Sequence, residues 1–233
     1  MKEWVISLSY FITGDTPSYG NLLKPKIIPY KSIARGDSCN LYVISMCNHI
    51  GTHVDAPAHF VKGGKRILDY FPNDLIFHMP MLVNIPKGPG EWIEEEDIKN
   101  MKIKNADCLL IRTGFAKFRN KEIYMTHNPG ISPEAIFLLR KNIRTLRCVG
   151  IDSISVGSFQ NRARGRRSHY TAFEKRRGLS EPLLLIEDMN LEPLKQNNMV
   201  KIKKIIVVPW LISDVDSAPC TVFAVIQSKN SKE

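Results

Sequence analysis

Long hydrophobic runs are missing from this chain of 233 residues. No apolar stretch approaches the roughly 18–20 residues that a membrane-spanning helix needs, so we expect no membrane segment. The opening stretch, MKEWVISLSYFITGD, also lacks the marks of a secretory signal, because an acidic residue interrupts it and no small-residue cleavage site follows. We therefore expect a cytoplasmic protein with no membrane partner.

Paired cysteines are missing as well. The number of cysteines is odd, their spacing is irregular, and no two of them form a CxxC motif. This pattern argues against a disulfide framework or a cysteine-rich zinc site, and it favours reduced, mostly buried thiols. The five positions are Cys39, Cys47, Cys108, Cys148 and Cys220.

Acidic side chains are fewer than basic ones, 23 against 33, which gives a formal net charge of +10. The basic excess peaks at RARGRRSHYTAFEKRR (162–177). One interpretation is a nucleic-acid surface. No known nucleic-acid-binding module and no pattern of stacking aromatic residues accompanies the run, so we expect no nucleic-acid partner. The simpler interpretations are a solvated surface, or arginines that attract an anionic substrate.

No internal repeat, low-complexity segment or linker divides the chain, and residues 1–233 are predicted to form a single domain. Short runs rich in β-branched and aromatic residues recur and are typical of strands. They lie at 4–12, 41–47, 81–85, 108–115, 148–156, 182–187, 204–212 and 221–227.

One helix is well signalled, in residues 131–148. Ser132 suits the N-cap, Pro133 the first helical position, and Glu134 the positive end of the helix dipole. A weaker helix is predicted over residues 94–102. A strand follows the first helix directly, so the pattern predicts an α/β domain with few helices. The apolar positions of the first helix recur at helical spacing and are Ile136, Leu139, Ile143 and Leu146.

The segment HIGTHVDAPAHF (49–60) holds three of the six histidines. Along an extended chain its odd positions from 49 to 59 carry the polar residues, and its even positions are mostly apolar. In one straight strand His49 and His53 would lie ~13 Å apart, which is too far for a shared metal ion. The chain must therefore turn, and Gly51 and Pro57 favour turning. The same two residues argue against a helix.

Imidazole and carboxylate side chains with no cysteine are typical of a catalytic metal site. Two other interpretations remain open. The histidines could be structural, or the protein could bind metal for storage or sensing without catalysis. A nucleophile formed by Ser45 or Cys47 near His49 is weaker, because no GxSxG motif is present.

At this point HIGTHVDAPAHF closely resembles the HxGTHxDxPxHF motif of the metal-dependent cyclase family, which includes bacterial kynurenine formamidase and isatin hydrolase. All eight fixed positions match. Further stretches also resemble that family, namely 7–20, 128–139, 150–156, 166–173 and 183–191. The resemblance implies an α/β single domain with a mixed β-sheet core and few flanking helices, of the swivelling β/β/α, cyclase-like type.

The resemblance also implies a set of metal ligands. His49, His53 and Asp55 would bind a first divalent ion. In two-metal members the aspartate bridges to a second ion, which His169 and Glu187 would complete. The implied cofactor is zinc or manganese, as one or two ions per subunit.

The resemblance gives His59 the role of the proton-transferring catalytic residue and Tyr19 a place near the substrate. The usual aromatic-Pro-Gly sequence appears here as Tyr19-Gly20, without the proline. Glu181 competes with Glu187 as the metal-binding carboxylate, but Glu187 ends a strand in a better local match.

The expected function is metal-dependent hydrolysis of a small-molecule amide, with conversion of N-formylkynurenine to kynurenine and formate as the leading candidate. An isatin-like cyclic amide or a lactone is the alternative substrate, and a basic nucleic-acid-binding protein with structural histidines is the alternative from another class. By analogy with the family we expect a homodimer or homotetramer.

Overall fold

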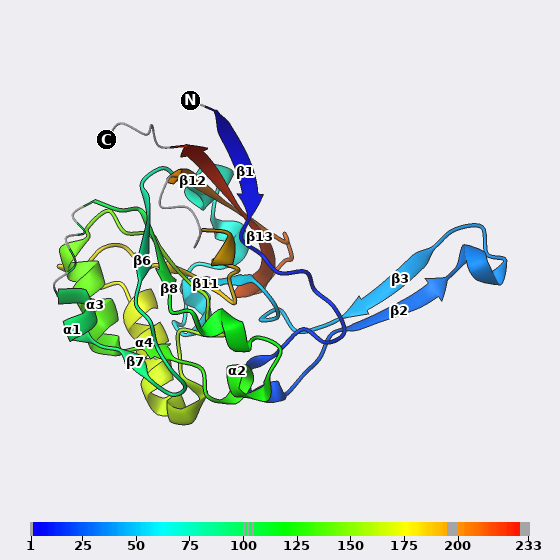
Figure 1. Cartoon of the computed structure of the whole chain (residues 1–233), viewed down its shortest axis with the longest axis horizontal. Helices are drawn as coiled ribbons and strands as arrows, with labels where there is room; N and C mark the ends of the chain where they lie inside the picture. The colour runs from blue at the N-terminus through cyan, green and yellow to red at the C-terminus, as the bar shows by residue number, and fades with distance from the viewer. Residues whose placement is uncertain (1, 100, 102, 104, 195–199, 229–233) are drawn as a thin grey trace.

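The computed structural model describes residues 2–99, 101, 103, 105–194 and 200–228, and a mixed β-sheet forms its centre (Figure 1). Within that part of the chain the sheet has nine strands, in the order β5-β12-β13-β4-β11-β10-β8-β6, with β1 beside β13. The edge strand β6 also contacts β12, so the sheet curls toward a barrel. The strands are β1 Glu3–Ser7, β4 His53–Asp55, β5 Ile76–Phe77, β6 Pro80–Asn84, β8 Cys108–Arg112, β10 Cys148–Ile151, β11 Leu184–Glu187, β12 Val200–Pro209 and β13 Ser217–Ser228.

Helices gather on one side of this sheet, where α1, α3 and α4 lie together in Figure 1. A short parallel pair joins the segment before α1 to the segment before α3. Its strands are β7 (Trp92–Ile93) and β9 (Gly130–Ile131). Among the described residues, no helix has the length and apolar character to cross a membrane. The helices are α1 Glu95–Lys99, α2 Glu122–Thr126, α3 Pro133–Asn142 and α4 Arg162–Phe173.

Side chains of the parallel strands β8, β10 and β11 alternate between two hydrophobic clusters, one on each face of the sheet. Along β8, Cys108 and Leu110 point into the curled sheet, where they pack with residues of β4, β12 and β13. Leu109 and Ile111 point the other way and pack against α3 and α4. This is the period-two alternation of a strand that is buried on both faces. The α/β mixed-sheet architecture predicted from the sequence is confirmed.

Each predicted strand overlaps an observed one, but the bounds differ: β12 and β13 begin earlier than predicted, and several other strands are shorter. The predicted strand 4–12 ends at Ser7, and 148–156 ends at Ile151, because both chains then leave the sheet as loops. The predicted helix 131–148 runs only from Pro133 to Asn142, with Ser132 capping it through the Ala135 amide. Ile143 and Leu146 are buried all the same, in a turn that leads into β10. The weak helix predicted at 94–102 is α1; residues 100 and 102 lie outside the described part.

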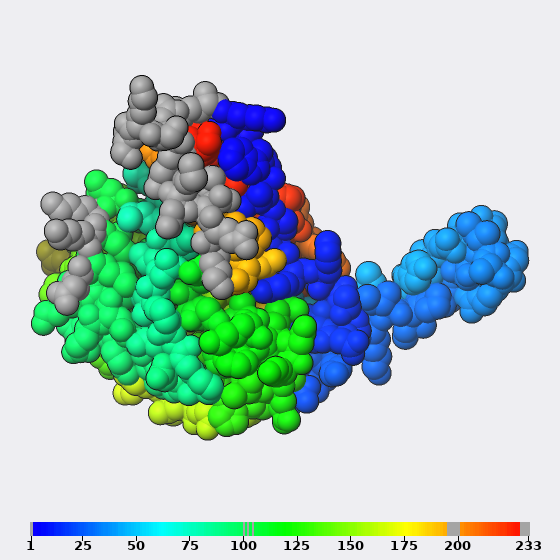
Figure 2. Space-filling view, viewed as in Figure 1, coloured from blue at the N-terminus to red at the C-terminus, as the bar shows by residue number. Residues whose placement is uncertain are grey.

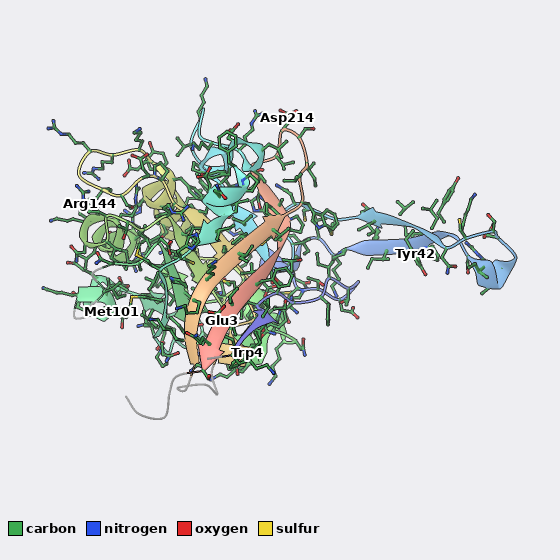
Figure 3. All side chains as sticks on the ribbon, turned by 90° about the horizontal axis from the view of Figure 1, so that it is seen from above. Glu3, Trp4, Tyr42, Met101, Arg144 and Asp214 are labelled. Atoms are coloured by element: carbon green, nitrogen blue, oxygen red, sulfur yellow. The ribbon has the colours of Figure 1, made fainter. Side chains whose placement is uncertain are left out.

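Helix α4 and strand β2 are among the elements that the sequence did not predict. Helix α4 lies in the basic run and buries mainly small or polar side chains, so it lacks the apolar spacing that identifies a helix. Strand β2 (Lys26–Lys31) pairs with β3 (Leu41–Ser45), which lies within the predicted strand 41–47, as an antiparallel hairpin. This hairpin projects from the body as a separate arm in Figures 1 and 2, and Figure 3 shows it with Tyr42 labelled.

A buried ionic network fixes the end of β11, where the metal-binding carboxylate is expected. Asp188 adopts a left-handed backbone conformation with φ 50° and is 1% exposed. Arg119 binds both of its carboxylate oxygens, at 2.9 and 2.6 Å, and the Tyr124 hydroxyl donates a third hydrogen bond at 2.6 Å. Thr52 donates to the Asp188 carbonyl oxygen, so the network also fixes the loop that precedes β4.

Replacing Arg119 with methionine is expected to lower the free energy of unfolding by about 3–5 kcal/mol, because the Asp188 charge would stay buried without its partner. Adding Asp188→Asn should recover part of that loss, since asparagine tolerates the left-handed conformation. Urea unfolding followed by circular dichroism measures both. Lys62→Met, on an exposed turn, is the control. Equal stability of Arg119→Met and wild type would show that the pair does not hold this strand end.

Candidate metal centre

The His-rich segment turns as its glycine and proline predict. Gly51 has φ 61°, in the left-handed region, and lets the chain enter the three-residue strand β4. Pro57 begins a single 3-10 turn, Pro57–His59, that places the third histidine beside the first two. The ring centroid of His49 lies 5.3 Å from that of His53 and 4.1 Å from that of His59. The rejection of a helix in this segment is confirmed.

Strand β4 is held between two antiparallel neighbours. Its His53 lies opposite Glu187 of β11, and its Asp55 lies opposite Ser217 of β13. Directly opposed residues in an antiparallel pair share one face of the sheet. The pairing therefore brings the His53 Nε2 atom to 3.4 Å from the Glu187 Oε2 atom, although the residues are far apart in the sequence.

The backbone sets the tautomers of two histidines. A carbonyl oxygen can only accept a hydrogen bond, so Nδ1 of His53 donates to Gly51 at 2.8 Å, and Nδ1 of His169 donates to Gly165 at 2.9 Å. When these rings are neutral, each keeps its Nε2 lone pair for another partner. Both Nε2 atoms face the Glu187 carboxylate, at 3.4 and 3.3 Å.

A second carboxylate, Asp216, joins two histidines at the pocket rim. Its Oδ2 lies 2.5 Å from His59 Nδ1 and 3.2 Å from His49 Nε2. The other nitrogen of His49 faces Asp55 Oδ1 at 3.0 Å. His49 thus lies between an almost fully buried carboxylate and a half-exposed one.

Two sets of donor atoms among the described residues lie within 4.8 Å of one another, as an ion requires. One consists of His49, Asp55 and His59; the other consists of His53, Asp55 and Glu187. Asp55 belongs to both, which is the geometry of a bridging ligand. His169 is outside both sets but contacts Glu187. These distances group the residues differently from the division implied by the resemblance.

The donor atoms fit a divalent cation because several of them are buried beside one another without forming a hydrogen bond. Nε2 of His53 and both carboxylate oxygens of Asp55 are buried without a hydrogen bond to any described residue. Such orphaned polar atoms are rare in folded proteins and cost free energy. Nitrogen and carboxylate donors suit zinc and manganese alike.

The electrostatics of the cluster point the same way. Burial lowers the pKa of His49, but the neighbouring carboxylates outweigh it and raise that pKa to about 10. The same balance raises the pKa of His53 and of His169. Burial also opposes ionisation of Asp55 and Glu187, yet the imidazoles hold both pKa values below the usual carboxyl range. The cluster therefore needs positive charge, either as protons or as a metal cation.

A pocket of about 330 Å³ opens beside the histidines. Tyr19 lies in its wall, edge to face with Phe159, and burial raises the Tyr19 pKa to about 12, so the phenol stays protonated. Gly20, with φ 68°, has no room for a side chain because an added Cβ would lie 2.3 Å from Phe159. Phe159 thus packs closely against both Tyr19 and Gly20.

Every residue predicted for the site lies in or beside this pocket. His49, His53, His59, His169, Glu187 and Tyr19 line it, and Asp55 lies behind them. The rival carboxylate Glu181 is exposed and faces Lys175 at 3.8 Å. Sequence reasoning missed Asp216, which lies 157 residues after His59. Its only local signal is its place just before a strand.

The fold and the cluster define an α/β protein with a histidine–carboxylate site at the floor of a pocket. A family model described as putative cyclase matches residues 6–158, and the chain belongs to that family. The resemblance inferred from the His-rich motif is thereby confirmed. An uncharacterised protein from Methanocaldococcus jannaschii is 32% identical over 183 residues, which cover 78% of this chain and 81% of the relative. Kynurenine formamidase from Bacillus cereus is 26% identical over 208 residues, 88% of this chain and 86% of the enzyme.

Solved structures with the same fold cover nearly the whole chain. Isatin hydrolase A from Labrenzia aggregata aligns with a TM-score of 0.74 at 20% identity, over 96% of this chain and 93% of that protein. A predicted metal-dependent hydrolase from Bacillus stearothermophilus aligns with a TM-score of 0.73 at 23% identity, over 97% and 99%. At these identities the likeness establishes the fold.

Zinc or manganese is expected to stabilise the metal-free protein. At a free metal concentration of 100 times Kd, the melting temperature should rise by roughly 5–10 °C. Asp55→Asn removes the shared donor and should abolish the rise, whereas exposed His78→Asn should keep it. Differential scanning fluorimetry and elemental analysis measure stabilisation and metal content. An undiminished rise in a folded Asp55→Asn variant would contradict a centre built on Asp55.

Proposed function

We propose that this chain is a hydrolase that uses a divalent cation to cleave an amide-like bond in a small molecule. The observation that carries the proposal is the set of buried donor atoms on His53 and Asp55 that form no hydrogen bond, at the base of a pocket. The similarity to Bacillus cereus kynurenine formamidase over most of both chains supports an aryl formamide as substrate. The leading reaction is conversion of N-formylkynurenine to kynurenine and formate.

His49, His53, Asp55, His169 and Glu187 are the residues that would hold zinc or manganese, as one ion or as two that share Asp55. A bound cation supplies a Lewis acid, which polarises a carbonyl group and lowers the pKa of water toward ~7. The hydrogen bonds from His53 and His169 to backbone carbonyls orient these rings before any ion binds. Such outer contacts fix ligand geometry and tune affinity.

His59 is the proposed proton-transfer residue. Nδ1 of His59 donates a hydrogen bond to the Asp216 carboxylate. Nε2 is therefore the ring nitrogen that can exchange a proton with the substrate or water. Water attacks the carbonyl carbon as Nε2 removes one of its protons. The carbon–nitrogen bond then breaks, and the leaving nitrogen takes that proton from His59. The products are an amine and a carboxylic acid, and the imidazole returns to its starting state.

The pocket walls suit an aromatic leaving group. Tyr19 and Phe60 offer ring surfaces, and Ile154 adds an apolar one. Phe60 also stacks on His169, with centroids 4.7 Å apart, so the wall and a proposed metal ligand are held together. An aniline-type amine fits between such surfaces better than an aliphatic chain, because ring faces stack with their full area.

A cyclic amide of the isatin type, or a lactone, is the second candidate substrate. The fold likeness to isatin hydrolase A supports it. Ring opening would use the same attack by water and the same proton transfer through His59. A direct comparison of N-formylkynurenine, isatin and simple lactones at matched concentrations separates these substrates.

The candidate from another class, a nucleic-acid-binding surface on 162–177, has less support. Several of its charges already have protein partners. Arg164 binds Glu94 through two hydrogen bonds, at 2.7 and 2.6 Å, and also contacts Glu134 at 3.3 Å. Binding to DNA or RNA that weakens steeply with salt, in a protein that hydrolyses none of the substrates, would favour this candidate.

His59→Ala is expected to lower kcat for N-formylkynurenine by about 10²–10⁴-fold, because a positioned proton-transfer group contributes that much. Metal content should stay close to wild type. Asp216→Asn should give a smaller loss, since the imidazole remains but loses its charged partner. Kynurenine formation followed by absorbance measures the rate.

Exposed His127→Ala is the matched control and should retain full activity. Wild-type activity in a metal-loaded His59→Ala variant would remove His59 from the mechanism. An absence of turnover with every amide and lactone tested, in protein that holds its metal, would contradict the hydrolase proposal.

A further inference from the structure

Two arginines stand on the same face of α4 as the predicted metal ligand. Arg162, Arg166 and His169 are spaced at i, i+4 and i+7, which places them along one side of a helix. All three line the pocket. With a rise of about 1.5 Å per residue, the arginines begin roughly 5 and 10 Å from His169 along the helix axis. The histidine lies at the floor and the arginines lie toward the mouth.

Among the described cations of the basic run that have no carboxylate within 4.0 Å, only Arg162 and Arg166 line the pocket. Arg164, Lys175 and Arg176 each have a carboxylate within 4.0 Å. Neither Arg162 nor Arg166 has a carboxylate partner among the described residues. Arg162 lies over the ring of Phe159, 4.1 Å from its centroid, which fixes its direction without neutralising it.

The surroundings of the pair are apolar and aromatic. Tyr19, Leu22 and Ile154 line the same pocket. The only carboxylate among the described lining residues is Glu187, on the floor among the histidines. Both arginines are exposed, whereas His169 is buried, so the guanidinium groups lie at the solvent edge of an apolar pocket. There their planar donors can bind a carboxylate in two-point fashion while the ligand's apolar part contacts the pocket wall.

We propose that Arg162 and Arg166 form an anion subsite, and that the substrate is an aromatic amide with a carboxylate about 5–10 Å from the scissile carbonyl. This inference rests on the proposed hydrolase function and names its substrate class. It favours open-chain aryl formamides with an acidic side chain, such as N-formylkynurenine. It disfavours isatin, which is neutral.

A matched pair of substrates tests the subsite. We would compare 4-(2-formamidophenyl)-4-oxobutanoate with its neutral primary amide, which differs only in the charged group. Wild type should prefer the carboxylate by about tenfold or more in kcat/KM, as expected for a charge-assisted hydrogen bond. Arg162→Gln and Arg166→Gln should each remove most of that preference, mainly by raising KM. The neutral amide should be little affected.

Arg167→Gln is the matched control, because this arginine lies on the same helix but outside the pocket. It removes the same charge and should keep the preference. Equal kcat/KM for the two substrates in wild type, or an equal loss in Arg167→Gln, would overturn the subsite while hydrolysis itself stood. Calorimetric binding of both compounds gives the same comparison if neither is turned over. In that case loss of hydrolysis counts against the proposed function, and binding alone decides the subsite.

Discussion

The burial of the Asp55 and Glu187 carboxylates is the constraint on which the site depends. Both side chains are at most 5% exposed. Taking an ionised carboxylate out of water costs several kcal/mol unless positive charge compensates it. Three imidazoles approach these two groups within 3.4 Å. Because the compensating nitrogens are also potential metal donors, the same atoms that permit burial would bind the ion. Stability of this region and metal binding are therefore linked.

Strand β4 has only three residues, and it directs two side chains, His53 and Asp55, into the site. With only His53–Asp55 in the strand, the residue before the central one and the residue after it point to the same side. Neighbours on both edges hold the backbone, so neither side chain can move without breaking the sheet. Glu187 arrives by pairing with one edge and Asp216 by the start of the strand on the other. Four chemically active residues thus meet although they are widely separated in the sequence.

Sequence reasoning succeeded where the information is local. The His-rich motif carries its own turn signals at Gly51 and Pro57, and most strands carry β-branched runs that need no partner to be seen. It failed where structure depends on distant contacts. Asp216 gains its place only through the pairing of β13 with β4, and α4 buries a face of glycine, serine and histidine that no hydrophobic period reveals. Of the arm, the sequence predicted only the strand at 41–47, whose apolar residues on both faces resemble those of a buried strand. That the strand belongs to a projecting hairpin was not predicted.

Helix α4 contributes to the pocket at two depths, with His169 beside the proposed metal site and two arginines nearer the solvent. Gly157 and Gly165 meet so closely that a Cβ on either would lie about 3.0–3.1 Å from the other's Cα. That contact seats the helix against the loop that holds Glu187 through the Val156 amide and the Ser155 hydroxyl. The depth of His169 is therefore fixed by the backbone, not by the side chains nearer the mouth. Residues one and two turns earlier on the same face can change without disturbing the proposed metal ligands. The same histidine–carboxylate cluster is therefore compatible with substrates of different charge, and in this chain those two positions are both arginine.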